Sequence, residues 1–357
     1  MISVGSTPSA PHTHVWGAPS YSWASDYKTC TASATCTGNG SHKTNVTVNT
    51  SYKVTTPATE TTDGVGLYTA TFTGIFTTQT KSVTIPKSGS GEGEDDPAVD
   101  PADALAASND TTGATDTAAI QALIDAAAST QGTVVLGSGV FYINASLDIH
   151  DGVTLKGQGW GRTVLKAAGE GYRGATLDGG AKLEGVTVTG FKINTKWYHG
   201  AGVLVTDGSV SWCCISNNVL SSNNSYGGGI AFPDKGKGSV DHSIIAFNQA
   251  GAYTSGGGGI AIYSSPNAIT IDACLVYGNT TSVSDAKGNG GGIGVFMNTP
   301  TVTIRNTTVA GNNSTGKAGG VSSDSYKANK VTLINCIVSG NTATESANAT
   351  TDGIDET

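Results

Sequence analysis

Glycine triplets followed by short apolar strands recur through the second half of the chain. Gly257-Gly-Gly-Ile-Ala-Ile-Tyr263 leads to Ile269-Thr-Ile271, then to Cys274-Leu-Val276 and to Asn279. Similar runs open at Gly227, Gly290 and Gly319. The asparagines that close successive units are spaced 25, 31, 33 and 29 residues apart, and they are Asn223, Asn248, Asn279, Asn312 and Asn341. Self-similarity at this period indicates a solenoid.

The apolar pattern of each unit predicts three short strands, and no unit contains a helical pattern. Successive units can then bury their apolar side chains only by stacking strand on strand, about 4.8 Å apart, which predicts a parallel β-helix. Because the unit length varies, the extra residues are expected in the loops before the glycine runs, on a face that can carry function. The first strands of the units align if these inward positions are equivalent: Val203, Ile230, Ile260, Ile293 and Val321.

The composition supports an all-β protein and excludes several partners. The 357 residues include 50 glycines, twice the usual share of about 7%, and only 13% are charged, where about 25% is typical. The formal net charge is −8 and there is no block of lysine or arginine, so we expect neither nucleic acid nor an anionic membrane as a partner. No run approaches the ~20 apolar residues of a membrane span.

Three zones of composition divide the chain. Residues 12–87 alternate threonine, valine and tyrosine with turn residues, which is typical of a small β-rich module. Residues 88–113 are acidic and rich in glycine, serine and proline, and they indicate a linker. Residues 114–350 hold one amphipathic helix, with Asp116 as its candidate N-cap, and then the repeats.

The repeat segment resembles the right-handed β-helix proteins of the pectate lyase and polygalacturonase superfamily. The matching text is the helix 116–127, Gly132-Thr-Val-Val-Leu-Gly137 and Val153-Thr-Leu-Lys-Gly-Gln-Gly159. The glycine-led coils also look like those of surface β-helix proteins, including the polymorphic outer-membrane proteins. The resemblance covers residues 113–345 and implies an all-β, right-handed parallel β-helix with an N-terminal capping helix. It selects no activity, because this scaffold serves lyases, hydrolases and adhesins.

Cysteine and histidine residues cluster in the N-terminal module. Cys30 and Cys36 form a C-x5-C pair near His12, His14 and His42, which is compatible with a disulfide, with free thiols or with a Cys2His2 zinc site. The spacing is not C-x2-C, so the disulfide and thiol interpretations are favoured. In the repeats, buried and unpaired cysteines are expected at Cys213, Cys214, Cys274 and Cys336.

The same module looks like modules repeated in large surface proteins of Gram-positive gut bacteria. The matching text runs from His12-Thr-His-Val-Trp-Gly17 to Tyr68-Thr-Ala-Thr-Phe-Thr73. The similarity implies a secreted or cell-surface location. Residues 1–10 lack the profile of a signal peptide, so we expect that the export signal was removed or that the chain is a piece of a larger protein. A further glycine-led strand begins at Thr351-Asp-Gly-Ile-Asp355, which predicts a truncated C-terminus.

Asparagines are also expected at the turns between strands. Asn217, Asn306 and Asn335 follow the second strand of their units, and asparagine tolerates the left-handed backbone of a tight turn. We therefore expect them to form a structural ladder and to have no part in a functional site.

Candidate catalytic carboxylates lie four residues after the inward positions of two neighbouring coils. Asp207 and Asp234 would stack there about 5 Å apart, and carboxylates so close repel each other unless one is protonated or a cation lies between them. Such a pair serves as nucleophile and acid in retaining glycosidases, or as calcium ligands in a lyase. The alternative is two solvated turn aspartates.

A second carboxylate pair, Asp234 and Asp241, is seven residues apart. It resembles the paired aspartates of the β-helical lacto-N-biosidases of gut bacteria, which implies a catalytic role for Asp241. Asp241 also falls in register with Asp272 and then Arg305, so a ladder of surface charges explains it at least as well.

Aromatic side chains gather near these aspartates. In a chain that is only 7% aromatic, the grouping predicts a platform for sugar rings. The candidate substrate-binding residues are Trp197, Tyr198, His199, Tyr226, Tyr253, Tyr263 and Lys235, with Phe296 beside them. A pectate lyase type of reaction would need calcium carboxylates and a base, for which the candidates are Lys235, Lys237 and Lys287. The three-aspartate signature of polygalacturonases is not found.

The sequence therefore predicts an extracellular or cell-surface, carbohydrate-active β-helix protein. Its reaction would be that of a polysaccharide lyase or a glycoside hydrolase acting on plant or host glycans. No cofactor is assigned, except that calcium is expected if the protein is a lyase. The alternative is a non-catalytic adhesin or structural β-helix that binds glycans or a host surface. We expect a monomer.

Overall fold

A computed structural model of the protein describes residues 13–24, 27–56, 64–85, 101, 103–222, 224–251, 256–282, 290–297, 301–323, 330–344 and 354–356. Contacts divide the chain into two units, Met1–Asp96 and Pro97–Thr357. Most of the predicted linker lies outside the described residues, as do His12, Asn223, Tyr253 and Lys287. No helix in the described part of the chain is long and apolar enough to cross a membrane.

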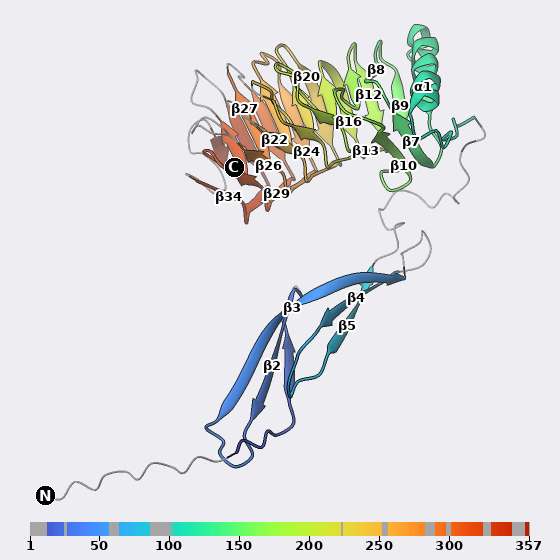
Figure 1. The fold of residues 1–357 in the computed structure, drawn as a ribbon. Helices are drawn as coiled ribbons and strands as arrows, with labels where there is room; N and C mark the ends of the chain where they lie inside the picture. Colours follow the sequence, from blue (N-terminus) through green and yellow to red (C-terminus); the bar gives the residue numbers. More distant parts are fainter. Residues whose placement is uncertain are drawn as a thin grey trace, which may run out of the picture. The chain divides into compact units, whose positions relative to one another are not determined.

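The N-terminal unit is a five-stranded antiparallel sheet in which each strand pairs with the next along the chain (Figure 1). Its strands are β1 (Ser20–Trp23), β2 (Thr29–Thr35), β3 (Lys43–Thr56), β4 (Gly64–Ala70) and β5 (Gln79–Ile85). The buried core of the unit is small and consists of Cys30, Ala32, Ala34, Ala70, Phe72 and Phe76.

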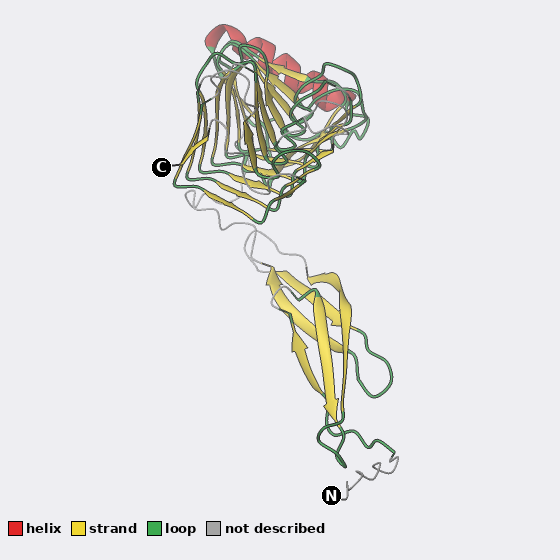
Figure 2. Cartoon of the chain, turned by 90° about the vertical axis from the view of Figure 1, so that its left-hand side faces the viewer, coloured by secondary structure: helices red, strands yellow, loops and turns green. Residues whose placement is uncertain are grey.

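The second unit is a parallel β-solenoid whose coils run through four sheets (Figures 1 and 2). We name them A to D in the order in which a coil visits them. Sheet A holds β8 (Leu147–Ile149), β11 (Ala175–Leu177), β15 (Val203–Val205), β19 (Ile230–Phe232), β23 (Ile260–Tyr263), β27 (Ile293–Phe296) and β31 (Val321–Ser323). Sheet B holds β6 (Thr133–Val135), β9 (Thr154–Lys156), β12 (Ala181–Glu184), β16 (Asp207–Ser211), β20 (Lys237–Asp241), β24 (Ile269–Asp272), β28 (Val302–Arg305), β32 (Val331–Ile334) and β35 (Ile354–Glu356).

The other two sheets complete each coil. Sheet C holds β7 (Gly139–Ile143), β10 (Thr163–Ala167), β13 (Thr187–Thr189), β17 (Cys214–Ser216), β21 (Ile244–Ala246), β25 (Leu275–Tyr277), β29 (Thr308–Ala310) and β33 (Ile337–Ser339). Sheet D holds β14 (Lys192–Ile193), β18 (Val219–Leu220), β22 (Gln249–Gly251), β26 (Thr280–Ser282), β30 (Asn313–Ser314) and β34 (Thr342–Ala343).

The prediction of three strands per unit was wrong, because it omitted sheet D. The strands of this sheet are two or three residues long, and polar residues such as Thr281 and Ser314 fill inward positions in them. The predicted alignment of sheet A is confirmed, because Val203, Ile230 and Ile260 pair with one another along successive strands. The alignment continues to Ile293 and Val321.

One helix precedes the coils, as predicted. Helix α1 (Ala114–Ala127) and the 3-10 turn η1 (Ala128–Thr130) lie at the N-terminal end of the solenoid (Figure 1). Gly113, with φ of 78°, is the N-cap, so the assignment of Asp116 to that position was wrong. The buried Asp116 carboxylate instead accepts hydrogen bonds from the backbone N–H groups of Ser108 and Tyr142, both at 2.9 Å. These bonds fix the helix to the first coil.

The end of the predicted linker already belongs to the solenoid. Leu105 forms a parallel bridge with Leu136, donating its N–H to the carbonyl of Val135 and accepting from Gly137.

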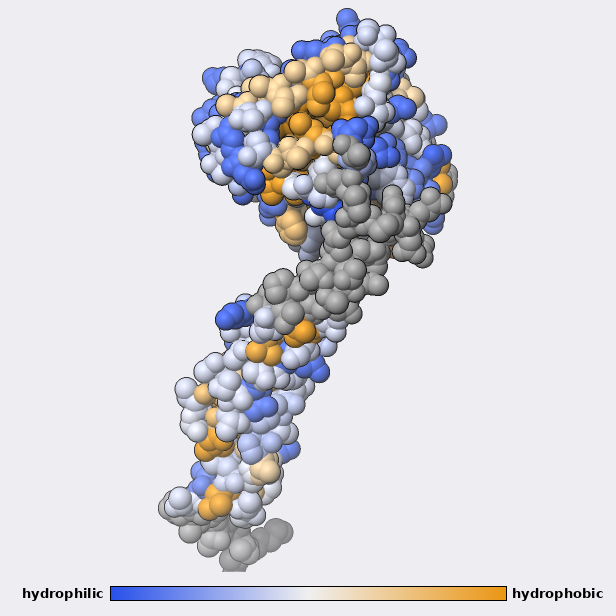
Figure 3. All heavy atoms as spheres, turned by 90° about the vertical axis from the view of Figure 1, so that its right-hand side faces the viewer, coloured by the Kyte–Doolittle hydropathy of each residue, from blue (hydrophilic) through white to orange (hydrophobic). Residues whose placement is uncertain are grey.

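An apolar area is visible on the face that Figure 3 presents. At the N-terminal end of the solenoid, Leu123 of α1 is 42% exposed.

A column of buried asparagines follows sheet C and links the coils. The Oδ1 atom of Asn279 accepts two hydrogen bonds from Asn248, one from its N–H (2.9 Å) and one from its Nδ2 (3.0 Å). Nδ2 of Asn279 donates to the carbonyl of Ile245 (2.8 Å) and to Oδ1 of Asn312 (3.0 Å). The column repeats at intervals of 30, 31, 33 and 29 residues and consists of Asn218, Asn248, Asn279, Asn312 and Asn341.

Two predictions about asparagine need correction. The first member of the column is Asn218, not Asn223, because a different asparagine of the run 217–224 lies in register. Asn217 lies after sheet C, whereas Asn306 and Asn335 lie after sheet B, so the three do not form one ladder. All three have the expected left-handed backbone, and Asn335 does donate from Nδ2 to Oδ1 of Asn306 (2.9 Å).

The three glycines of each run have three different structural roles. Gly257 has a φ of 65°, which a residue with a side chain adopts at a cost in energy. A Cβ on Gly258 would lie 2.3 Å from the carbonyl oxygen of Thr280, and one on Gly259 would lie 3.0 Å from the Asn279 side chain. Only the third glycine of the run is therefore required by the asparagine column; the first is required by its backbone conformation and the second by the backbone of the neighbouring segments.

The last strand differs from its prediction. The segment after Thr351 was expected to open another strand of the glycine-led sheet. β35 instead pairs with β32 in sheet B, with Ile354 opposite Val331.

Replacing Asn279 with alanine should destabilise the solenoid. The N–H and Nδ2 of Asn248 and the carbonyl of Ile245 would lose a buried partner, and each such group costs about 1–3 kcal/mol. We expect the free energy of unfolding in urea to fall by about 3 kcal/mol.

Asn217→Gly is the matched control. The equivalent position is Phe247 in the next coil and is already glycine in the three coils after it, at Gly278, Gly311 and Gly340, and Asn217 is exposed. Its stability should change by no more than about 0.5 kcal/mol. Equal effects of the two substitutions would contradict a special role for the buried column.

Candidate functional site

The first candidate pair, Asp207 and Asp234, does not stack as predicted. Asp207 opens β16 and lies in register with Lys237 of β20, and its Oδ2 is 2.9 Å from Lys237 Nζ. Asp234 and Lys235 lie in an exposed turn before β20, where Lys235 has a φ of 63°. The residues 234–236 have no counterpart in the preceding coil, and this insertion shifts the register by three positions. The ion pair neutralises Asp207, so no repelling carboxylate pair is formed at this place.

The second candidate pair, Asp234 and Asp241, flanks a strand. Asp241 is the last residue of β20, whose five residues span about 13 Å, and Asp234 precedes that strand. Carboxylates that act together on one glycosidic bond are about 5–9.5 Å apart. This arrangement does not favour a glycosidase pair.

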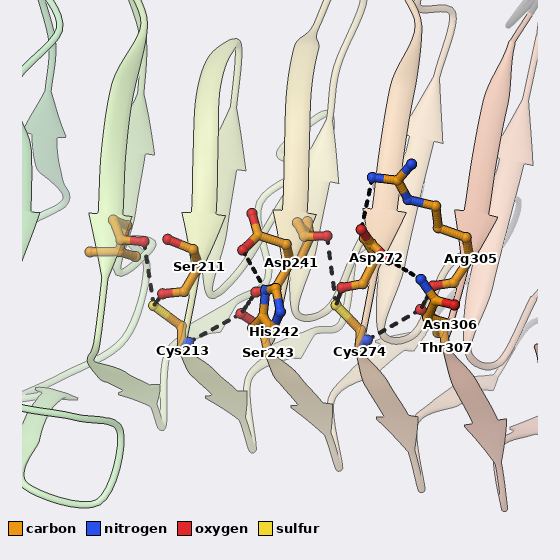
Figure 4. A network of polar contacts seen from close by, with 12 residues as sticks. Ser211, Cys213, Asp241, His242, Ser243, Asp272, Cys274, Arg305, Asn306 and Thr307 are labelled. Carbon is orange, nitrogen blue, oxygen red and sulfur yellow. Dashed lines mark hydrogen bonds and ion pairs between the residues drawn. The ribbon is translucent and has the colours of Figure 1, made fainter. Parts of the chain in front are cut away.

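Asp241 belongs to a row of polar side chains at the corner between sheets B and C (Figure 4). It is in register with Asp272, and Asp272 with Arg305, which confirms the predicted charge ladder. Asp241 contacts Nδ1 of His242 at 3.1 Å, and Arg305 Nη2 lies 2.8 Å from Asp272 Oδ2. A hydrogen bond from Asn306 and the nearby Arg305 charge lower the pKa of Asp272. The charged side chains of the ladder therefore have partners within the ladder or next to it.

Cysteines on the inner side of this corner are structural. Burial raises the pKa of Cys213 and Cys274 to about 12, and each Sγ donates to a backbone carbonyl two residues earlier, at 3.1 Å (Figure 4). A thiol with so high a pKa is not a nucleophile at neutral pH. The expected burial is confirmed for these two, while Cys214 and Cys336 are half-buried, and none of the four forms a disulfide.

The predicted aromatic platform is partly formed. The rings of His199, Tyr226 and Tyr263 pack on one another, with centroids 5.5 Å (His199–Tyr226), 5.7 Å (His199–Tyr263) and 4.6 Å (Tyr226–Tyr263) apart. Phe296 continues the group at 5.0 Å from Tyr226 and is buried. The other three rings are half-buried, so their edges reach solvent. Trp197 is 67% exposed.

Sheet A positions this ring stack. His199 and Tyr226 each lie four residues before the inward residue of a strand, and Tyr263 is the outward residue at the end of β23. The first glycine of each run turns the chain over the outer face of the sheet; a Cβ on Gly227 would lie 2.9 Å from that of Ala231. The segments before the glycine runs therefore bring His199 and Tyr226 of neighbouring coils together, and Tyr263 joins them from the end of β23.

His199 is held neutral. Burial and the nearby charge of Arg173 lower its pKa from 6.5 to about 4. Its Nδ1 also accepts a hydrogen bond from the N–H of Tyr226, at 3.2 Å, which a protonated imidazole could not do. The imidazole in the ring stack is thus uncharged at physiological pH.

Arg173 is the residue that sequence reasoning missed. Its guanidinium lies over the ring of Tyr198, 4.9 Å from the centroid, and its Nε is buried without a hydrogen-bond partner. No ion pair joins Arg173 to a carboxylate in the part of the chain that the structure describes. Burial lowers the pKa of Arg173. It is one of only three arginines in the sequence, and that rarity is the one signal that could have pointed to it.

The structure separates the two cysteines of the N-terminal unit and brings one of them close to two histidines. Cys30 and Cys36 lie six residues apart along one strand, about 20 Å, far beyond the ~7 Å Cα separation of a disulfide. The disulfide interpretation was therefore wrong, and the six cysteines, all described, form no disulfide. His14, Cys36 and His42 do come together, with their ligand atoms within 4.8 Å of one another.

Comparison with known protein families identifies the solenoid. Residues 104–354, more than half of the chain, match the family described as "Rhamnogalacturonase A/epimerase, pectate lyase-like". The chain therefore belongs to this pectate lyase-like β-helix family, in agreement with the resemblance seen in the sequence. A search among curated proteins finds no match.

Solved structures give distant similarities. The A-module of the mannuronan C-5 epimerase AlgE4 of Azotobacter vinelandii is 15% identical, with 68% of this chain and 95% of that chain covered and a TM-score of 0.25. The A-module of AlgE6 from the same organism is 17% identical over the same shares, with a TM-score of 0.19. The catalytic domain of Agl-KA is 11% identical, with 96% of both chains covered and a TM-score of 0.25.

The depressed pKa of His199 predicts a pH-dependent loss of stability. In the unfolded chain the imidazole is protonated with a pKa of about 6.5, and in the folded chain with a pKa of about 4. The contribution of His199 to the free energy of unfolding is therefore complete above about pH 6.5 and is lost as the pH falls from 6.5 to 4. In His199→Asn, the side-chain oxygen can still accept the Tyr226 hydrogen bond but does not titrate. Between about pH 6.5 and 4, the free energy of unfolding measured in urea should depend less on pH for the variant than for the wild type. Identical slopes for both proteins would contradict the burial of a neutral imidazole.

Proposed function

We propose that the solenoid binds an acidic polysaccharide, one that contains uronic acid residues, at the outer edge of sheet A. The observation that supports this most directly is Arg173, a half-buried cation with no carboxylate partner among the described residues. A buried charge without a partner is costly, and a ligand carboxylate would supply the missing charge and bidentate hydrogen bonds. The adjoining stack of His199, Tyr226 and Tyr263 offers apolar ring surface to a sugar.

Among reactions, we propose lyase chemistry in preference to hydrolysis. A retaining hydrolase needs two carboxylates about 5 Å apart, and the pair expected for that role is replaced by the ion pair between Asp207 and Lys237. Elimination from a uronate transfers the proton on the carbon beside the sugar carboxylate to a base, forms a carbon–carbon double bond and breaks the bond to the glycosidic oxygen, which leaves with a proton. Lys235 remains the candidate base, because Lys237 is paired with Asp207. The step also requires a cation that neutralises the sugar carboxylate. Arg173 would supply the cation. The family to which the chain belongs supports a polysaccharide as substrate.

Roles for calcium, Asp234, Asp241 and Lys235 remain predictions. Among the described residues, the one group of three or more metal-ligating side chains is His14, Cys36 and His42, which contains no carboxylate. A secreted or cell-surface location fits a polysaccharide substrate and is part of the proposal.

Binding can be tested with matched oligosaccharides. Arg173→Gln keeps much of the side-chain volume and removes the charge, so calorimetry should show at least tenfold weaker binding of oligogalacturonides and oligomannuronates. A tenfold change corresponds to about 1.4 kcal/mol. Arg305→Gln makes the same substitution on the corner between sheets B and C, where the arginine is paired with Asp272, and this control should bind as the wild type does. Unchanged binding by Arg173→Gln, or equal binding of neutral and acidic oligosaccharides, would overturn the proposed site.

The reaction can be tested on the same substrates by product analysis. A lyase gives unsaturated products, whereas a hydrolase gives new reducing ends without unsaturation. We expect unsaturated products, and we expect them to be lost in Arg173→Gln and retained in Asp207→Asn. New reducing ends without unsaturation would contradict lyase chemistry. Binding without any product would identify a non-catalytic glycan-binding solenoid, the alternative that the sequence leaves open.

A further inference from the structure

The N-terminal unit contains a cluster that its fold does not explain. His14 precedes the bridge between Trp16 and Cys36, Cys36 follows β2, and His42 immediately precedes β3. Three segments that are separate in the sequence thus bring two imidazoles and one thiol to a single place. Their ligand atoms all lie within 4.8 Å of one another.

Backbone hydrogen bonds hold these three segments together. The N–H of Cys36 donates to the carbonyl of His42 (2.9 Å), and the N–H of Thr37 donates to the carbonyl of Val15 (2.8 Å). The turn before His42 is closed by its N–H, which donates to the carbonyl of Asn39 (3.0 Å). The positions of the cluster are therefore set by the sheet and do not depend on the side chains alone.

The side chains are arranged as ligands would need to be. The two imidazole rings are 5.0 Å apart at 64°, so they converge edge to face, and His14 is kept in place by stacking on Trp16 at 5.0 Å. Cys36 is buried, His42 is half-buried and His14 is exposed, which leaves one side of the cluster open to solvent. In a tetrahedral zinc site the ligand atoms are ~3.5 Å apart, so only a small contraction is required.

We propose that His14, Cys36 and His42 bind one zinc ion. Nitrogen and thiolate sulfur are the ligands that zinc prefers, and three protein ligands leave a fourth position for water or another donor. The second thiol of the module, Cys30, lies at the other end of β2 in the apolar core and is not a ligand. Among the described residues, the geometry thus gives three of the ligands considered from the sequence, and His12 lies outside that part of the chain.

Such an ion would have a clear structural effect. Among the described residues, the apolar core cluster of this unit has six buried members, and small domains with little apolar core are commonly stabilised by metals. The metal would tie the segment before Trp16 to the turn between β2 and β3. We therefore expect zinc to stabilise the N-terminal unit and to leave the solenoid unaffected.

The proposal can be tested on the full chain after removal of metals with a chelator. Equilibrium dialysis should show one zinc ion per chain, and cobalt should give the visible bands of a tetrahedral site together with thiolate-to-cobalt charge-transfer absorption. Cys36→Ser should lose the charge-transfer band. His14→Asn should weaken zinc binding at least about 100-fold, more than the loss of an outer-shell partner does. Because His14 is exposed, this variant does not depend on core packing to fold.

Cys30→Ala is the matched control, since it removes a thiol of the same unit that lies outside the cluster. It should retain one zinc ion per chain and the cobalt spectrum. Zinc binding that is absent in the wild-type chain, or unchanged in His14→Asn and Cys36→Ser, would overturn the proposal. A cobalt complex without tetrahedral bands or without thiolate charge transfer would overturn the proposed set of ligands.

Discussion

The buried asparagine column is the constraint on which the solenoid depends. Each carboxamide from Asn218 to Asn341 joins its coil to the neighbouring coils through buried hydrogen bonds, and these bonds have no substitute if one member is lost. The glycine that opens each strand of sheet A packs directly on this column, since a Cβ on Gly259 would meet Asn279. The two residue types that repeat in the sequence, asparagine and glycine, therefore pack against each other in the structure.

This contact also determines where a functional site can form. The glycine runs turn each coil over the outer face of sheet A, and the residues just before them, His199 and Tyr226, meet ring to ring on neighbouring coils. The row of charges at the corner between sheets B and C is satisfied internally, by pairs such as Asp272 and Arg305. Arg173, beside the rings, has no such partner among the described residues. This difference supports the proposed binding of an anionic sugar beside Arg173.

Much of the fold could be predicted from the sequence, and less of the site. The inward positions of sheet A repeat with a strong pattern, so their register was predictable. Sheet D was missed because polar Thr281 fills an inward position that apolar periodicity cannot detect. The stacking of Asp207 on Asp234 failed because an insertion at the corner, residues 234–236, changes the register without disturbing the pattern on either side. Arg173 precedes the glycine triplets, so no repeated pattern in the sequence points to it.

The most direct measurement is a crystal structure of the chain with a bound oligouronide. Our account predicts a sugar carboxylate within hydrogen-bonding distance of the Arg173 guanidinium and a sugar ring against the stack of His199, Tyr226 and Tyr263. An oligosaccharide seated instead on the Asp241, Asp272 and Arg305 corner, or one whose carboxylates all point away from Arg173, would contradict it.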